Sequence, residues 1–403
     1  MDPVQRQYEA YPYPARDPAD EVKRLIEGSP SHPVEIDHYL FQGRRDWSEP
    51  FRALVAGGGT GDGLIMLSQK LSDIGCPAEV TYIDMSVASR QIAEARASAR
   101  GLKVNFITGD LLSAPELGTF DYIDCCGVLH HLPDPDAGFR ALAQALSPEG
   151  GMGCMVYAPY GRSGVYPIQD AFKTLFEGLS PETKVAAAQA VLDDLPDAHP
   201  FARNQVLGDH QTSHAGLYDL LLHSCDRAYT ITEFAHALTR AGLGLVSVLG
   251  RQRYDPGDYD WSAGELGARL KELTPLQRLA VGEQLSGTIK THIVYATQAG
   301  REDKAEARPT KPTLVPHLAG VDPRALAHQI HQHGGFTATE DGQNLSVNVP
   351  RAAAPMIARV DGRTPLGAIA AGQDWLAFSA TWAPAHRALT SMNLLHYSTG
   401  ARR

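Results

Sequence analysis

Residues 54–63 read LVAGGGTGDG, and this glycine-rich stretch constrains the fold of the chain more than any other feature. An apolar run leads into the glycines, and a helical pattern follows them. Asp84 ends the next apolar run, TYID, and lies about 23 residues beyond Gly61. Glycines let the backbone approach a ligand that a Cβ atom would exclude, and an acid at this spacing can accept hydrogen bonds from ribose hydroxyls. The pattern predicts a site for a nucleotide-type cofactor.

Strand-like and helical patterns alternate after residue 50, which is typical of a parallel sheet with right-handed crossovers. Helical patterns fill the gaps between apolar runs at 52–56, 79–83, 103–107, 120–126 and 152–158. The alternation stops over residues 160–230 and then resumes, with a helix at 231–243, a strand at 244–249, helices within 262–284 and a strand at 291–296. We therefore predict an α/β fold with a Rossmann-like core, a seven-stranded, mostly parallel sheet, and a helical cap insertion over the ligand crevice.

The rest of the chain divides by composition. Residues 1–50 are rich in proline, tyrosine and charge, and predict an arm that covers the active site and holds one short helix around 17–27. Residues 51–300 form the predicted core domain with its insertion, and 301–316 read as a charged, proline-bearing linker. Residues 317–403 predict a small α+β unit with a hairpin that turns at Asp341-Gly342, similar to a winged-helix domain.

Composition excludes several classes of function. The chain has 403 residues, 43% hydrophobic and 20% charged, with a net charge of −10, which argues against nonspecific nucleic-acid binding. No apolar run approaches the roughly 20 residues that span a bilayer, and the start has no apolar signal core, so we expect no membrane partner and a cytoplasmic location. The five cysteines form no CxxC pair, so we expect reduced thiols and no metal site.

Three further motifs narrow the type of cofactor. The glycine loop lacks the Lys-Ser/Thr of a phosphate-binding loop, which argues against ATP hydrolysis. GDLL (109–112) ends the third strand, and GVLHHL (127–132) follows the fourth. With these motifs in order, the chain resembles a class I S-adenosylmethionine-dependent methyltransferase over residues 50–158. The resemblance implies that S-adenosyl-L-methionine is the cofactor and that the enzyme transfers its methyl group.

The resemblance also implies cofactor-binding roles for individual residues. Asp84 would bind the ribose hydroxyls, and Asp110 would accept a hydrogen bond from the adenine amino group. Gly127 would face the methionine part of the cofactor. The chain departs from the family where many relatives carry an acid, because Val55 stands two residues before the first glycine of the loop. The remaining implied contacts come from the glycine loop and from the neighbours of the two acids, namely Gly57, Gly58, Gly59, Gly61, Met85 and Leu111.

Candidate catalytic residues lie in the predicted crevice. Histidine is the usual general base near neutral pH, and an arginine suits a carboxylate or phosphate group on an acceptor. The same side chains could instead pack or cap their loops. His210 and His214 have the i, i+4 spacing of one helix face, which permits a metal site, but without an HExxH motif a polar cap that lines a pocket is the favoured interpretation. The candidates are His130 and His131 after the fourth strand, Tyr13 in the arm, Tyr160 and Arg162 after the fifth strand, and His210 and His214 in the insertion.

The sequence thus predicts a methyltransferase that modifies an oxygen or nitrogen of a small or medium organic acceptor enclosed by the cap. One alternative is a protein or peptide methyltransferase whose C-terminal unit recruits the substrate. A second alternative is a nonenzymatic cofactor-binding scaffold. The C-terminal unit could also form a homodimer contact or only stabilise the chain.

Overall fold

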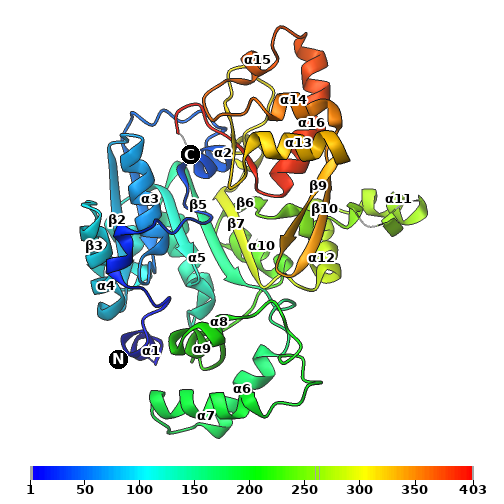
Figure 1. The fold of residues 1–403 in the computed structure, drawn as a ribbon. Coiled ribbons are helices and arrows are strands. Elements are labelled where there is room, and N and C mark those ends of the chain that lie inside the picture. Colours follow the sequence, from blue (N-terminus) through cyan, green and yellow to red (C-terminus); the bar gives the residue numbers. More distant parts are fainter. Residues whose placement is uncertain (1–2, 259, 263, 402–403) are drawn as a thin grey trace.

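The computed structural model describes residues 3–258, 260–262 and 264–401, and its centre is a twisted seven-stranded sheet (Figure 1). The strand order is β3-β2-β1-β4-β5-β7-β6, and only β7 runs antiparallel to its neighbours. This is the predicted Rossmann-like sheet, and all seven predicted strands are present. The strands are β1 (Phe51–Ala56), β2 (Ala78–Asp84), β3 (Asn105–Thr108), β4 (Phe120–Cys126), β5 (Leu146–Tyr157), β6 (Leu243–Val248) and β7 (Thr291–Gln298).

Helices cover both faces of this sheet. One face packs against α2 (Pro33–Leu40), α3 (Asp62–Asp73) and α4 (Val87–Ala99), and the other against α5 (Pro135–Ala145) and α10 (Ile231–Arg240). Two further helices, α11 (Gly264–Glu272) and α12 (Pro275–Ser286), precede β7. Because both faces are covered, the central strands are buried almost throughout, which is why they read as continuous apolar runs.

The prediction of a single short helix in the N-terminal arm was wrong. The arm holds α1 (Pro3–Ala10) and α2, and between them only a short 3₁₀ helix at Pro18–Val22. Every residue of α2 is buried, including Asp37 and His38. A helix buried on all sides has no polar face, so the 3.6-residue periodicity that reveals a surface helix is absent from its sequence.

The insertion contains four helices, which lie below the sheet in Figure 1. They are α6 (Val165–Leu175), α7 (Pro181–Asp193), α8 (Asp209–Thr212) and α9 (His214–Leu221). The expected single helix face for His210 and His214 is wrong, because Ser213 is extended (φ −164°, ψ 160°) and caps α9 by accepting from Gly216 N–H. We call α6–α9 the cap.

The C-terminal unit is an α+β assembly of two small sheets and several helices. Its hairpin turns at Asp341-Gly342 as predicted, whereas the pairing of β8 with β11 was not foreseen. The comparison with a winged-helix domain stays a prediction. The elements are β8 (Pro316–Leu318), α13 (Pro323–His333), β9 (Gly335–Glu340), β10 (Gln343–Asn348), α14 (Ala354–Ile357), α15 (Leu366–Ile369), α16 (Trp375–Ser391) and β11 (Leu395–Tyr397).

This unit is docked on the core through buried contacts. The Ser398 hydroxyl donates to the Asp37 carboxylate at 2.6 Å, and Tyr397 N–H donates to His38 Nδ1 at 3.2 Å. The segment that reads as a linker is packed as well, since Ala305 and Ala307 are buried. Charge and proline in this stretch therefore mark a polar connection and not a free tether.

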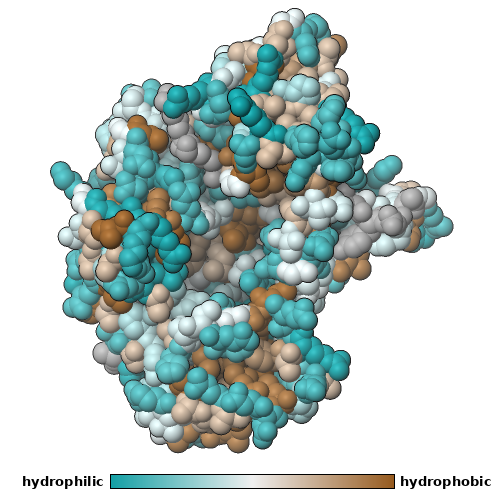
Figure 2. All heavy atoms as spheres, viewed as in Figure 1, coloured by the Kyte–Doolittle hydropathy of each residue, from teal (hydrophilic) through white to brown (hydrophobic). Residues whose placement is uncertain are grey.

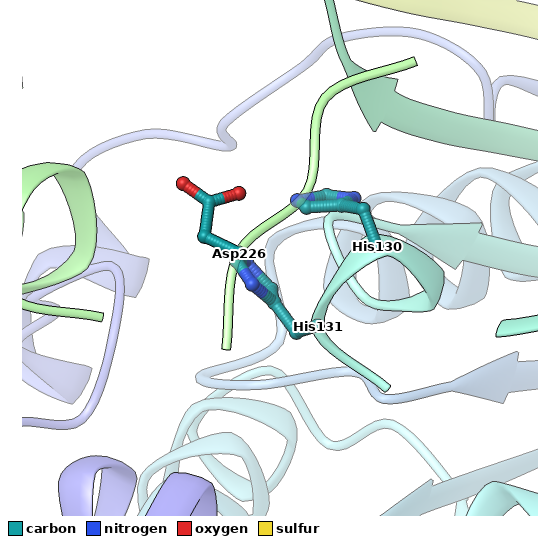
Figure 3. Close-up of side chains that lie close together, drawn as sticks. All are labelled: His130, His131 and Asp226. Atoms are coloured by element: carbon teal, nitrogen blue, oxygen red, sulfur yellow. The ribbon is translucent and has the colours of Figure 1, made fainter. Parts of the chain in front are cut away.

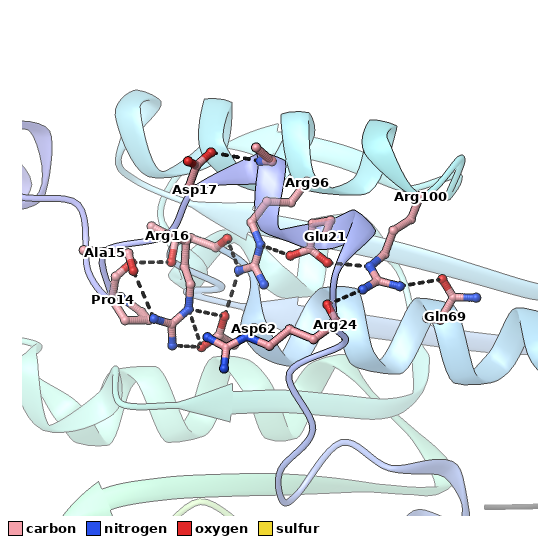
Figure 4. Close-up of polar contacts among 12 residues, drawn as sticks. Pro14, Ala15, Arg16, Asp17, Glu21, Arg24, Asp62, Gln69, Arg96 and Arg100 are labelled. Carbon is pink, nitrogen blue, oxygen red and sulfur yellow. Dashed lines mark hydrogen bonds and ion pairs between the residues drawn. The ribbon is translucent and has the colours of Figure 1, made fainter.

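Buried ion pairs fasten the arm to the core (Figure 4). Arg96 of α4 is 1% exposed and donates to Glu21 at 2.6 Å and to Asp62 at 2.8 Å. Arg100 also pairs with Glu21, and Arg16 of the arm lies 2.6 Å from Asp62. Asp62 begins α3, directly after the glycine loop, so the arm is anchored at the edge of the predicted cofactor site.

We expect Glu21→Gln to open the arm, because it leaves the Arg96 guanidinium buried with its charge less compensated. Removing one partner of a buried ion pair costs about 3 kcal/mol, which corresponds to roughly a hundredfold more of the open form. The measurement is the rate of tryptic cleavage within residues 15–30. Asp20→Asn is the matched control: it breaks an exposed ion pair with Lys23 on the same 3₁₀ helix. Equal cleavage rates in the two variants would contradict the assigned role of the Glu21 pair.

Candidate active site

A cavity of about 740 Å³ lies at the carboxyl ends of β1, β2 and β4, between the sheet, the arm and the cap. In the space-filling view, hydrophobic side chains gather on the lower part of the molecule, over the cap (Figure 2). Parallel strands place ligand sites at this edge of a sheet. The predicted cofactor-binding residues that line the cavity are Gly57, Gly58, Gly59, Asp84, Met85, Asp110, Leu111 and Gly127.

The glycine loop leaves no room for side chains. A Cβ atom on Gly57 would lie 2.5 Å from Cγ2 of Val128, and one on Gly59 would lie 2.9 Å from the carbonyl oxygen of Tyr13. Both glycines have positive φ angles, 68° and 52°, which other residues rarely adopt. Gly61 differs, because it does not line the cavity: it precedes α3 at φ 100° and faces Ala93 of α4.

Two acids present carboxylates along the same wall. Asp84 accepts from Gly59 N–H and from Ser86 N–H, both at 2.8 Å, so its carboxylate is fixed against the glycine loop. Burial raises the pKa of Asp84, and these two hydrogen bonds act in the opposite direction. Asp110 accepts from Leu112 N–H at 2.9 Å. The free lone pairs of both acids fit the hydroxyls and amino group of a nucleoside-bearing cofactor.

The remainder of the cavity lining is more polar and comes from the arm, the loops after β4 and β5, and the cap. Of the predicted catalytic candidates, three line it: Tyr13, His131 and Arg162. The other four do not. Tyr160 and His210 are half-buried outside the cavity, His214 is exposed, and His130 is fully buried behind His131.

His131 has a defined tautomer. Its Nδ1 lies 2.8 Å from the carbonyl oxygen of Cys225, and a carbonyl can only accept, so Nδ1 carries the proton. The other ring nitrogen, Nε2, is buried and has no hydrogen-bond partner among the described residues. His131 stacks on His223 with ring centroids 3.7 Å apart, which holds the ring in place.

A carboxylate anchors the hydroxyls on this wall. Tyr157 donates to Asp219 at 2.7 Å, and Tyr8 of the arm donates to it at 3.1 Å. Tyr8 is also 3.2 Å from Nε2 of His223. Burial raises the pKa of Asp219. The arm, the sheet and the cap thus meet in one hydrogen-bonded cluster at the cavity.

Two sets of described side chains have the proximity that a metal ion requires: His130, His131 and Asp226, whose ligand atoms lie within 4.8 Å of one another, and His131, Asp219 and His223. Figure 3 shows the first set, with both histidines on the loop after β4 and Asp226 facing them. In the second set His223 Nδ1 accepts from Cys225 N–H, so Nε2 is protonated and has no lone pair for a metal.

The first set already contains a cation. Arg162 is 3% exposed, donates to Asp226 at 3.2 Å, and lies 3.7 Å from the centroid of the Tyr157 ring. Burial lowers the pKa of His130, which keeps that ring neutral. A divalent ion beside Arg162 would therefore bring two more positive charges to one carboxylate. The charge balance therefore favours a polar ligand over a metal ion at the histidine nitrogen atoms that have no described hydrogen-bond partner.

Among the cavity residues that the sequence analysis does not name as site residues are Asp124, Tyr157, Asp219 and Lys290. Tyr157 and Asp124 lie within strands, where a polar residue reads as part of an apolar run. Lys290 directly precedes β7 and carries no motif. Asp219 follows the pattern of a cap helix, and only the fold shows that it points to Tyr157.

Some known proteins resemble one domain of the chain, and others resemble most of its length. Residues 54–152 match the family model described as "Methyltransferase domain". A ubiquinone biosynthesis O-methyltransferase of Xanthomonas axonopodis pv. citri is 36% identical over 104 residues, a match that spans 25% of this chain and 42% of that enzyme. An uncharacterized protein of Synechococcus sp. is 29% identical over 297 residues, or 72% of this chain and 69% of that one.

The solved structure of PKMT2 from Rickettsia typhi shares the fold over the full length of the chain. Its TM-score is 0.61 at 12% identity, with 100% of this chain and 77% of that chain covered. A second structure of the same protein, in complex with AdoHcy, covers 91% of this chain and 75% of that chain, also with a TM-score of 0.61. Among the described residues, no helix is long and apolar enough to cross a membrane. With its glycine loop, its sheet order and the matching family model, the chain contains a class I S-adenosylmethionine-dependent methyltransferase domain.

Proposed function

We propose that this enzyme methylates an oxygen or nitrogen of a small or medium organic acceptor that lies between the cofactor and the cap. One observation carries the proposal: a single cavity runs from the glycine loop to the polar wall of Tyr13, His131 and Arg162. Its volume of about 740 Å³ falls in the range of about 300–1,000 Å³ that is usual for small-molecule sites. The cofactor supplies an activated methyl group when it is bound.

In this proposal the protein orients the acceptor and keeps water out. Glycine loop, Asp84 and Asp110 hold the cofactor along one wall, and the arm covers it. The opposite wall offers donors and acceptors that can fix a hydroxyl or amine in line with the methyl group. Proximity and orientation of this kind can supply about 7–11 kcal/mol of the barrier.

His131 is the group that we propose takes the proton from the acceptor. The Cys225 carbonyl holds a proton on Nδ1, which leaves Nε2, buried and without a hydrogen-bond partner among the described residues, as the nitrogen that would take the acceptor's proton. Tyr13 and Arg162 bound the same space and position the acceptor. His130 supports His131 from behind, with ring centroids 4.1 Å apart.

His131→Asn should lower kcat by about 10²- to 10⁴-fold, because the amide keeps a donor for the Cys225 carbonyl but has no basic nitrogen. The affinity for S-adenosylhomocysteine should stay the same. The loss should shrink as the assay pH is raised, since hydroxide then removes the acceptor proton. Steady-state kinetics with labelled cofactor measure this, with His214→Asn as the exposed histidine control. Unchanged kcat in His131→Asn would rule out the base role.

Chelation separates the proton-transfer proposal from a metal site at His130, His131 and Asp226. We expect turnover after dialysis against EDTA to equal that of the untreated enzyme. Activity that is lost on dialysis and restored by one equivalent of a divalent ion would instead identify the cluster of Figure 3 as a metal centre.

Asp84→Ala tests the cofactor side. Loss of charge-assisted hydrogen bonds to the ribose hydroxyls costs about 1.5–3 kcal/mol, or roughly a 10- to 100-fold higher Kd. Calorimetry should show this for S-adenosylhomocysteine and equally for 5′-methylthioadenosine, because both carry the ribose. Wild-type affinity for either ligand in this variant would contradict the assignment of Asp84.

A specific contact favours a second candidate, methylation of a peptide or protein. Lys290 lines the cavity and lies 3.3 Å from Asp341, at the turn of the C-terminal hairpin. A substrate held by the C-terminal unit would thus lie near the cavity. PKMT2, which shares the fold over the whole chain, supports a common architecture and no more.

The two candidates differ in the size of the methylated product. A lysate is separated by ultrafiltration into small-molecule and protein fractions, and each is incubated with enzyme and labelled cofactor. We expect label in the small-molecule fraction, and its absence in His131→Asn. Label confined to the protein fraction would replace the first candidate with the second.

A further inference from the structure

The sequence raised one question about the cofactor site, because Val55 stands where many relatives carry an acid. The sheet register shows an acid beside that position. Val55 of β1 pairs with Asp124 of the parallel strand β4. Paired residues of adjacent parallel strands point to the same face of a sheet, and both of these residues line the cavity. The chain therefore has a carboxylate one strand away from where the family pattern places it.

Asp124 is buried without a balancing charge. Its side chain is 3% exposed, and burial raises the pKa of its carboxyl group. Asp62, another acid of the cavity wall, is paired with Arg16 and Arg96. No described lysine, arginine or histidine makes such a pair with Asp124, whose described partners are the hydroxyl of Ser31 and the thiol of Cys126. A buried carboxylate with only neutral partners is costly unless a cation joins it.

The first turn of α3 leaves space for this carboxylate. A Cβ atom on Gly63 would lie 2.5 Å from Oδ2 of Asp124. Glycine in a helix is unfavourable relative to alanine, so a helical glycine needs a reason in packing or function. Here a side chain at residue 63 would collide with the Asp124 carboxylate at the oxygen that accepts from Ser31.

We propose that Asp124 binds the α-ammonium group of the methionine part of S-adenosylmethionine, in place of an acid at residue 55. Asp124 lies beside Val55, which precedes the glycine loop, and three residues before Gly127; the family resemblance assigns the methionine end of the cofactor to these two segments. Ammonium and carboxylate would neutralise each other in a buried site, where such a pair with hydrogen-bonded partners is favourable.

The same carboxylate connects the cofactor to the arm. Ser31 belongs to the arm and donates its hydroxyl proton to Asp124. The Ser31 hydroxyl satisfies one oxygen of the carboxylate while the ammonium group is bound at the other. Binding of the amino-acid part of the cofactor to Asp124 would thus affect the hydrogen bond that holds Ser31 of the arm.

The test compares two ligands that differ in the amino-acid part. S-adenosylhomocysteine carries the α-ammonium group, whereas 5′-methylthioadenosine has the same nucleoside without it. Calorimetry should show that Asp124→Asn raises the Kd for S-adenosylhomocysteine by about 10- to 100-fold and changes that for methylthioadenosine less than about twofold. Asp84→Ala is the matched control, because it should weaken both ligands equally.

A second variant protects the test against misfolding. Val55→Asp combined with Asp124→Val returns the acid to β1 and should recover at least part of the affinity for S-adenosylhomocysteine. Equal weakening of both ligands in Asp124→Asn, or weakening of neither, would overturn the proposal. So would a double variant that binds methylthioadenosine normally but S-adenosylhomocysteine no better than Asp124→Asn. Loss of methylthioadenosine binding in both variants would assign Asp124 a structural role instead. These binding measurements need no acceptor, so their outcome is independent of the proposed function.

Discussion

The whole site depends on how closely the backbone approaches itself at the carboxyl ends of β1 and β4. Val128 occupies the space in which a side chain at Gly57 would lie, and the Tyr13 carbonyl does the same at Gly59. Without side chains there, the loop can turn back, the Asp84 carboxylate can be fixed against Gly59, and a cavity forms. A larger residue at either position would displace the segment packed against it, which is the loop after β4 at Gly57 and the arm at Gly59.

The arm is part of the catalytic domain and not an appendage to it. It is held at one end by the buried pairs around Arg96 and at the other by Tyr8, which donates to Asp219 beneath the cap. The Pro14 carbonyl, between these two contacts, accepts from Thr60, and Ser31, farther along the arm, donates to Asp124. The arm therefore contacts both the cofactor wall and the polar wall of the cavity.

The sheet and the cofactor wall could be predicted from the sequence because their signals are local. Apolar runs, glycines and an acid at fixed spacing report strand, loop and helix without reference to the rest of the chain. Family membership also removes the nonenzymatic scaffold from the alternatives. What the sequence did not reveal depends on contacts between distant segments: the pairing of β8 with β11, the fully buried α2, and the cluster of Tyr157 with Asp219.

Asp124 was missed for a related reason, since its significance lies in its register against Val55 and not in its neighbours along the chain. The histidines at 210 and 214 show the opposite error. Their spacing suggested one helix, but the helix is interrupted at Ser213, which is extended.

The ion pair between Lys290 and Asp341 has a consequence for how the C-terminal unit should be studied. Asp341 also pairs with Arg253, at 2.6 Å, so one carboxylate of the hairpin compensates two cations of the core. In a truncated enzyme without this unit, Lys290 of the cavity lining would lose this carboxylate, so the cavity would be more positive there. Acceptors that carry a carboxylate or phosphate would then bind more readily, and cationic ones less so. Removing the unit changes the electrostatic selectivity of the entrance as well as the size of the protein.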